Sequence, residues 1–338
     1  MLVSVVIPCY NSEHTIDKVV DSCMEEFARW DGYECEMILV NDYSKDGTFR
    51  TIQRMAAKYP NVTGISLARN FGQHAAIMAG LAYVHGDYVV GMDDDMQNHP
   101  SQIKQFLDKA KEGYDVIFGI YKKRKFSFWK NLTSKIGTSL MNHLLDGPEG
   151  IERSNFWLAR RYVIDEVKKY DGCDPFIQLL FFRTTHNMAN IVIDHYEREV
   201  GSSNYTFRKG LKLFMSIVSY STIPLRISTY FGIVFSLVGF VSALVVLIRK
   251  LIDPTIAVGW SSLMCTYLLL AGFLFLMLGI IGEYIGKIIL NGSKTPQYVI
   301  RNTVHGDKTE SAENSETSAA AGPRGDKYKI TSDSKTSK

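Results

Sequence analysis

Short apolar runs alternate with amphipathic stretches over about the first 120 residues of the chain. Five apolar runs have the length of β-strands, and they lie at 4–8, 36–41, 62–67, 87–92 and 115–119. The stretches between them have helical spacing, and they lie at 14–29, 48–58, 73–85 and 101–112. This alternation predicts an α/β, Rossmann-like fold with a mainly parallel sheet and helices on both faces. Ligands bind such sheets beyond the carboxyl ends of the strands, so functional residues are expected there.

Two long runs without charge follow, at 227–248 and 260–282. Each is long enough to cross a hydrocarbon core of about 30 Å, because a helix rises about 1.5 Å per residue. The short linker between them predicts an antiparallel transmembrane hairpin, assigned to 227–290. Lys and Arg flank its outer ends, and the positive-inside rule therefore places both flanks in the cytoplasm. A pair of buried core helices is the alternative.

The remaining segments complete the predicted domain organisation. Residues 1–206 are expected to form a cytoplasmic domain, because the N-terminus has the pattern of a buried strand and lacks the features of a signal peptide. Residues 207–226 mix basic and apolar side chains, which predicts a juxtamembrane amphipathic helix or, alternatively, a soluble connecting helix. Residues 291–338 are predicted to be a cytoplasmic tail. Its polar composition predicts disorder from about residue 303.

Charge and cysteine content exclude several classes of protein. The net charge of +3 argues against a nucleic-acid partner, which normally requires a dominant basic face. The five cysteines include no C-x-x-C pair, so reduced thiols are expected instead of a zinc site or a disulfide framework.

An acidic run, Asp93-Asp94-Asp95, directly follows the fourth apolar strand. Adjacent carboxylates repel one another unless a cation lies among them, and a hard divalent cation binds such oxygen ligands. A solvated acidic turn that caps the next helix is the alternative. The sequence contains no G-x-x-x-x-G-K-[ST] and no G-x-G-x-x-G after the first strand, so a P-loop and a dinucleotide fold are not supported.

Six motifs, in order, resemble those of one enzyme family. They are VSVVIPCYNSEHTI, ILVNDYSKDGT, LARNFGQHAAIMAGL, MDDDMQNHP, the set Arg198, Gly201, Ser203 and Tyr205, and GEYIGK at 282–287. Together they resemble the family 2 glycosyltransferases of GT-A fold. The resemblance covers about residues 2–300 and is strongest to the polyprenyl- and dolichyl-phosphate sugar transferases.

The resemblance implies roles for particular residues. The nucleotide-sugar would contact Pro8, Tyr10, Asn11, Asp42 and Asp94. A Mg²⁺ or Mn²⁺ ion would be held by Asp93, Asp95 and Gln97. The acceptor phosphate would be bound by Lys130, Ser134 and Arg198, and by Arg124 from the basic run 122–125. Asp93, Asp95, Lys130 and Arg198 would be the catalytic residues.

Two positions depart from the family pattern. Asn41 stands where relatives often have aspartate, which affects base selectivity. Trp157 stands where many relatives have arginine, which predicts an altered donor-sugar pocket.

The expected function is metal-dependent, inverting transfer of a sugar from a UDP- or GDP-sugar to polyprenyl phosphate, with undecaprenyl phosphate as the expected acceptor. A phosphate monoester has a second pKa of about 6 and is already a nucleophile at neutral pH, so a strong general base is unnecessary. The resemblance implies a multi-pass protein of the bacterial inner membrane that makes a lipid-linked sugar donor for envelope glycans or lipopolysaccharide. A processive polysaccharide synthase, a non-catalytic membrane scaffold and a transporter subunit are the alternatives. A homo-oligomer formed through the hairpin also stays open.

Overall fold

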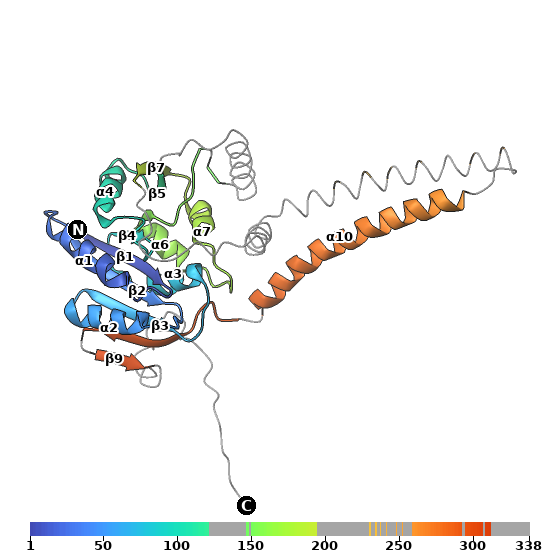
Figure 1. Cartoon of the computed structure of the whole chain (residues 1–338). Helices are drawn as coiled ribbons and strands as arrows, with labels where there is room; N and C mark the ends of the chain where they lie inside the picture. Colours follow the sequence, from blue (N-terminus) through green and yellow to red (C-terminus); the bar gives the residue numbers. More distant parts are fainter. Residues whose placement is uncertain are drawn as a thin grey trace, which may run out of the picture.

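The computed structural model describes residues 1–121, 147–148, 150–194, 259–292, 295–306 and 308–311, with isolated positions at 230, 234, 237, 241, 248 and 252. The first half alternates strand and helix as predicted (Figure 1). Its elements are β1 (Leu2–Cys9), α1 (Ile16–Ala28), β2 (Glu34–Asn41), α2 (Thr48–Lys58), β3 (Val62–Leu67), α3 (Gln73–Leu81), β4 (Tyr88–Gly91), η1 (Pro100–Gln102), α4 (Ile103–Lys111) and β5 (Val116–Tyr121).

Later segments add both helices and strands to this unit. They are β6 (Trp157–Arg160), α6 (Arg161–Val167), α7 (Ile177–Thr184), β7 (Met188–Ile193), β8 (Ile300–His305) and β9 (Lys308–Ser311). The strands form one sheet in the order β7-β5-β6-β4-β1-β2-β3-β8-β9. The pairs β1–β2, β1–β4, β2–β3 and β5–β7 are parallel. The pairs that involve β6, β8 and β9 are antiparallel.

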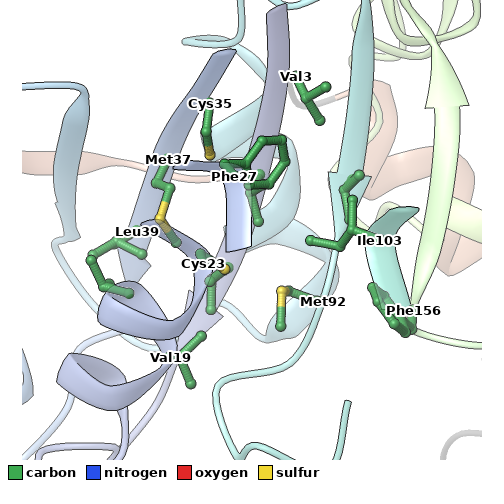
Figure 2. Packing of buried hydrophobic residues seen from close by; sticks show 14 of the residues in the cluster. Val3, Val19, Cys23, Phe27, Cys35, Met37, Leu39, Met92, Ile103 and Phe156 are labelled. Atoms are coloured by element: carbon green, nitrogen blue, oxygen red, sulfur yellow. The ribbon is translucent and has the colours of Figure 1, made fainter. Parts of the chain in front are cut away.

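Helices cover both faces of the sheet, as the pattern of the sequence predicts. Along β2, Met37 and Leu39 pack in one core with α1, α2 and α4, whereas Ile38 and Val40 pack in the other with α3, α6 and α7. Figure 2 shows the first core, in which side chains of α1 lie against Met37 and Leu39 of β2. Successive residues of a strand point to opposite faces, so an uninterrupted apolar run supplies both cores.

The α/β fold class is confirmed, but the sheet is mixed and not mainly parallel. The expectation was wrong because β6 lies antiparallel between β4 and β5, and its four residues carry too short a pattern to predict the insertion.

The predicted boundary at residue 206 and the predicted disorder from about residue 303 also need correction. β8 and β9 come from the C-terminal part of the chain, and β8 pairs with β3 at the far side of the sheet. Residues 303–305 and 308–311 are therefore strand, because the sheet edge supplies backbone partners to a segment that is too polar to order itself.

A long helix, α10 (Trp260–Gly292), precedes β8 and projects away from the sheet (Figure 1). It contains the second predicted span, 260–282, and continues ten residues beyond it, since it ends at Gly292. Within the part of the chain that the structure describes, no helix has both the length and the apolar character needed to cross a membrane. The hairpin 227–290 is therefore not shown, and the predicted amphipathic helix 207–226 lies outside the described residues.

Candidate active site at the strand ends

Three loops meet where β1, β2 and β4 end. Cys9 of β1 lies opposite Asn41 of β2, and Val6 lies opposite Gly91 of β4, so the residues after these strands share one edge of the sheet. Each loop contains a non-glycine residue in the left-handed region, and these are Asn11 (φ 54°), Tyr43 (φ 57°) and Met96 (φ 59°). Such backbone is uncommon outside glycine and concentrates at functional sites.

The loops after β1 and β2 hold each other in place. The backbone N–H of Asn11 donates to Ser44 Oγ at 3.0 Å, and Asn11 Oδ1 accepts the backbone N–H of Lys45 at 3.0 Å. The backbone N–H of Ser12 donates to Thr48 Oγ1 at 2.8 Å. The predicted nucleotide-binding residue Asn11 therefore lies in a loop whose conformation is fixed by its neighbour.

Asp42, predicted to contact the nucleotide, is buried and anchors a third loop. Its two carboxylate oxygens accept the backbone N–H groups of Phe71 at 2.7 Å and Gly72 at 2.9 Å. Burial raises the pKa of Asp42, and the two N–H donors oppose that rise. The structure places Asp42 at the predicted edge, where its side chain fixes the β3–α3 loop. A contact of Asp42 with the nucleotide stays a prediction.

Asp94 connects the acidic run to the loop after β1. Its Oδ2 accepts the backbone N–H of Tyr10 at 3.1 Å. Burial also raises the pKa of Asp94. The Tyr10 side chain is half exposed, and Pro8 lies one residue before the end of β1. These three residues of the predicted nucleotide site are thus brought to one edge, and their contact with a ligand stays a prediction.

Asp93 is the most strongly perturbed carboxyl group of the run. Burial raises its pKa to about 7, and the neighbouring charges of Asp95 and Asp94 add to the rise. Two side-chain amides oppose it, since Gln73 Nε2 donates to Asp93 Oδ1 at 2.7 Å and Asn155 Nδ2 lies 3.5 Å from Oδ2. A carboxyl group with this pKa at a strand end is a candidate for functional chemistry.

The donor set fits a divalent ion that binds together with a phosphate ligand. The backbone N–H of Gln97 donates to Asp95 Oδ1 at 3.1 Å, which places the two predicted ligands in one turn. Among the described residues, no group of three or more His, Cys, Asp or Glu side chains is arranged to hold a metal. Mg²⁺ is often bound by one or two carboxylates while substrate phosphates and water complete the shell. The oxygen donors of Asp93, Asp95 and Gln97 suit that kind of site.

Sequence reasoning missed four polar residues near the acidic run. Gln73 and Asn155 contact Asp93, as described above. Tyr121, at the end of β5, donates its hydroxyl hydrogen to Asn98 Oδ1 at 2.8 Å. Burial raises the pKa of Tyr121, and the charge of Asp93 adds to that rise. The contact of Asn155 with Asp93 follows from the pairing register of β4 and β6, and the sequence pattern does not reveal that register.

The structure places the Trp157 side chain in the core and not in a donor-sugar pocket, whereas a change in that pocket through loss of the arginine stays a prediction. Trp157 is fully buried in the second core, where its ring packs edge-on against Phe181 with centroids 4.8 Å apart. A methyl group at Gly91 would lie 2.3 Å from the same indole, so the glycine is needed for this close approach. The tryptophan packs against Gly91 at the end of β4. Asn155, two residues earlier in the chain, is the residue that contacts Asp93 of the acidic run.

The predicted acceptor site lies outside the described residues. Arg124, Lys130 and Ser134 fall within 122–146, and Arg198 falls within 195–229. Their roles stay predictions.

The pKa of Asp93 predicts a pH-dependent stability for the metal-free protein. The folded pKa of about 7 exceeds the reference value of 3.8, so the folded state prefers the protonated carboxyl group. Stability is therefore lost as pH rises between these values. The Asp93→Asn variant, which mimics the neutral form, should raise the melting temperature more at about pH 8 than at about pH 5. Thermal melts of both proteins in EDTA test this, and an equal shift at both pH values would contradict it.

The sequence also matches known proteins. Residues 4–168 match the model of the family described as glycosyl transferase family 2. An uncharacterized glycosyltransferase, YkcC, of Bacillus subtilis (strain 168) is 34% identical over 309 residues, which cover 89% of this chain and 93% of the relative. An undecaprenyl-phosphate 4-deoxy-4-formamido-L-arabinose transferase of Klebsiella pneumoniae (strain 342) is 33% identical over 315 residues, which cover 92% of this chain and 96% of the relative.

Among solved structures, a glucosyl-3-phosphoglycerate synthase from Mycobacterium tuberculosis in complex with Mn²⁺, UDP-glucose and phosphoglyceric acid matches with a TM-score of 0.44 and 22% identity. The match covers 59% of this chain and 72% of that chain. The two sequence relatives extend over nearly the whole chain at more than 30% identity. The protein is thus a glycosyltransferase that belongs to glycosyl transferase family 2.

Proposed function

We propose that this glycosyltransferase moves a sugar from a nucleotide-sugar to a polyprenyl phosphate, with undecaprenyl phosphate as the acceptor. The observation that carries the proposal is the convergence of three loops: Asp94 of the acidic run contacts Tyr10 after β1, and Asn11 after β1 contacts Ser44 after β2. The relative from Klebsiella pneumoniae, named for transfer to undecaprenyl phosphate, supports the acceptor class because it aligns with 92% of this chain.

The donor nucleotide is proposed to bind over the strand ends of β1 and β2. Tyr10 offers a half-exposed ring beside a loop that is already fixed by hydrogen bonds, so little ordering is needed on binding. Asp42 holds the β3–α3 loop along the same edge. Pro8 and Asn11 shape the same surface from β1 and the loop that follows it. A UDP- or GDP-sugar fits this description equally well.

A divalent ion, Mg²⁺ or Mn²⁺, is proposed to bind with the diphosphate at Asp93, Asp95 and Gln97. When bound, it neutralises the charge that develops on the leaving diphosphate. The carboxylates would hold that ion beside the diphosphate. Burial, followed by the charges of Asp95 and Asp94, raises the pKa of Asp93, and a bound cation would favour the charged form of this carboxyl group.

The acceptor phosphate is proposed to attack the anomeric carbon directly. Its monoester is largely dianionic at neutral pH, so the protein must position it and offset its charge but need not deprotonate it. One phosphate oxygen forms the new bond to the anomeric carbon, and the bond to the nucleoside diphosphate breaks on the opposite face, which inverts the configuration. Arg124, Lys130, Ser134 and Arg198 are proposed to bind this phosphate through their positive charges and a hydroxyl group.

The long helix α10 is proposed to bind the lipid bilayer from which the acceptor comes, as part of the hairpin 227–290. Apolar side chains are exposed along it at helical spacing: Leu263, Tyr267, Leu270, Leu274, Leu278, Ile281, Ile285 and Ile288. Leu263 and Ile288, near its two ends, are 63% and 69% exposed. An apolar stripe of this length marks an interaction surface. A bacterial inner membrane would supply both the bilayer and the acceptor.

The full chain is expected to sediment with membranes and to stay there after an alkaline carbonate wash. Substituting both Leu274→Lys and Leu278→Lys should shift protein to the soluble fraction, because charges at these exposed positions oppose contact with acyl chains. Gln105→Lys, on the exposed face of α4, is the matched control and should not change the distribution. Recovery of the unmodified chain in the soluble fraction without detergent would contradict a membrane role for α10.

The donor and acceptor are tested together by mass spectrometry of the lipid product. Purified protein with Mn²⁺ is incubated with undecaprenyl phosphate and each of a panel of UDP- and GDP-sugars. One donor is expected to give a lipid whose mass increases by a single sugar residue. A series of products with increasing numbers of sugars would favour a processive synthase, and no product with any donor would contradict the proposal.

A further inference from the structure

The carboxylate of Asp93 lies between two neutral side-chain amides. Gln73 Nε2 donates to Oδ1 at 2.7 Å from the side of α3, and Asn155 Nδ2 faces Oδ2 at 3.5 Å from the side of β6. Both oxygens of one carboxylate are thus engaged by donors from different elements. We call Gln73 and Asn155 the amide clamp.

The first arm of the clamp is held by the buried carboxylate of Asp42. Gln73 is the first residue of α3, directly after Gly72, whose φ of 92° lets the chain turn into the helix. The backbone N–H of Gly72 donates to Asp42 at 2.9 Å. The position of Gln73 is therefore fixed by the strand end of β2, although its side chain is exposed.

The second arm follows from the antiparallel pairing of β4 and β6. Tyr88 lies opposite Arg160 and Gly91 lies opposite Trp157. Continuing this register by two residues beyond the last pair places Asn155 opposite Asp93. The buried Trp157 thereby anchors the strand that presents Asn155 to the acidic run.

A third amide fixes which end of the Asn155 side chain faces Asp93. Gln178, buried in α7, donates from Nε2 to Asn155 Oδ1 at 3.2 Å and lies 3.5 Å from the carbonyl oxygen of Ser154. Because Asn155 Oδ1 accepts this hydrogen bond, its Nδ2 is the group left to donate toward Asp93.

We propose that the amide clamp, braced by Gln178, is a positioning device that orients the Asp93 carboxylate for the transfer reaction. Neutral donors suit this task better than Lys or Arg, because they fix the orientation of the carboxylate without neutralising its charge. Each carboxylate oxygen keeps a second lone pair for a further partner. The inference rests on the proposed function, since it assigns a role in that reaction.

Gln73→Glu and Asn155→Asp test the clamp, since each replaces a donor with an acceptor of nearly the same size. Each should lower kcat by about 10- to 100-fold, with the KM for the nucleotide-sugar within about threefold of the wild-type value. Mn²⁺ titrated alone and followed by electron paramagnetic resonance should bind at least as tightly as to the wild type, because a carboxylate is added. Gln105→Glu, an exposed glutamine on α4, is the matched control with unchanged kcat.

Gln178→Glu tests the brace without touching Asp93. Glutamate at this position cannot donate to Asn155 Oδ1, so the Asn155 amide should turn and present its oxygen to Asp93. The kcat should fall as it does for Asn155→Asp, and Gln178→Met, which neither donates nor accepts strongly, should have a smaller effect. A Gln178→Glu variant that melts like the wild type and keeps its kcat would overturn the brace.

The outcomes distinguish a failure of the clamp proposal from a failure of the proposed function on which it rests. A wild-type protein that neither transfers sugar nor binds Mn²⁺ would overturn the proposed function, and the inference with it. A wild-type protein that does both, alongside Gln73→Glu and Asn155→Asp variants with kcat within about twofold of its value, would overturn the clamp alone. Loss of Mn²⁺ binding together with a lowered melting temperature in the exposed Gln73→Glu variant would also overturn it, because that result indicates a structural role only.

Discussion

The Asp95→Asn variant is expected to lose about three orders of magnitude in kcat, or about 4 kcal/mol of transition-state stabilisation. Asp95 lies in the turn that also holds Gln97, with the Gln97 N–H on its Oδ1. Asparagine keeps the size of the side chain and an acceptor oxygen, so the fold should be preserved. The negative charge that would bind a divalent ion beside the leaving diphosphate is lost, and turnover should fall with it.

Initial rates at saturating nucleotide-sugar, over a range of Mn²⁺ concentrations, measure this effect. Asp108→Asn on α4 is the matched control, because Asp108 pairs with Lys104 at the surface and such pairs contribute little. The control should keep the wild-type rate. An Asp95→Asn variant with a rate within about tenfold of the wild type at every Mn²⁺ concentration would exclude a metal role for Asp95.

The largest loss of stability is expected from Trp157→Ala, at about 3–5 kcal/mol. The indole is fully buried between Gly91, the last residue of β4, and the ring of Phe181. Its removal leaves a cavity beside Gly91. Trp157→Phe should cost less, because an aromatic ring remains and a buried indole N–H with no partner among the described residues is removed. Thermal or urea unfolding of the full chain in detergent measures both losses.

The half-buried Trp30 supplies the control for this prediction. It packs at the edge of the first core against Phe27, with ring centroids 4.7 Å apart, so Trp30→Ala should destabilise the protein less than Trp157→Ala. The donor preference of Trp157→Phe should match that of the wild type. A changed preference for the sugar without a change in melting temperature would contradict the core assignment and restore a donor-pocket role for this position.

The first half of the fold could be predicted because its elements carry their own local pattern. The bounds of β3 at 62–67 and α2 at 48–58 agree with the expectation residue for residue. The strands β1, β2, β4 and β5 were found with small differences at their ends. Apolar runs of this length, buried on both faces, are informative without any knowledge of tertiary contacts.

The later strands could not be predicted because their partners, and not their own composition, make them strands. β8 reads IRNTVH and is mostly polar, yet it pairs with β3 more than 230 residues earlier in the chain, as in the contact of Thr63 with His305. β6 has four residues, and its place between β4 and β5 follows from tertiary packing. A pattern limited to neighbouring residues carries no information of this kind.

The candidate site likewise contains residues whose positions could be predicted from the sequence and residues whose contacts could not. The positions of Asp42 and the acidic run followed from the rule that ligands bind beyond strand ends, and the structure confirms that both lie at that edge. The contact of Asn155 with Asp93 depends on the β4–β6 register, so the sequence pattern could not reveal it. The core position of the Trp157 side chain could not be predicted, because a departure from a family motif does not show which way the side chain points.

The most direct test of the central claim is metal-dependent transfer of radiolabelled sugar into organic-extractable lipid. The purified full chain is supplied with undecaprenyl phosphate and the preferred nucleotide-sugar, first with EDTA and then with Mn²⁺ in excess. We predict no label in the lipid phase with EDTA, label after Mn²⁺ is added, and none for Asp95→Asn under either condition. Label that appears equally in EDTA, or that enters a water-soluble polymer instead of the lipid, would contradict the account.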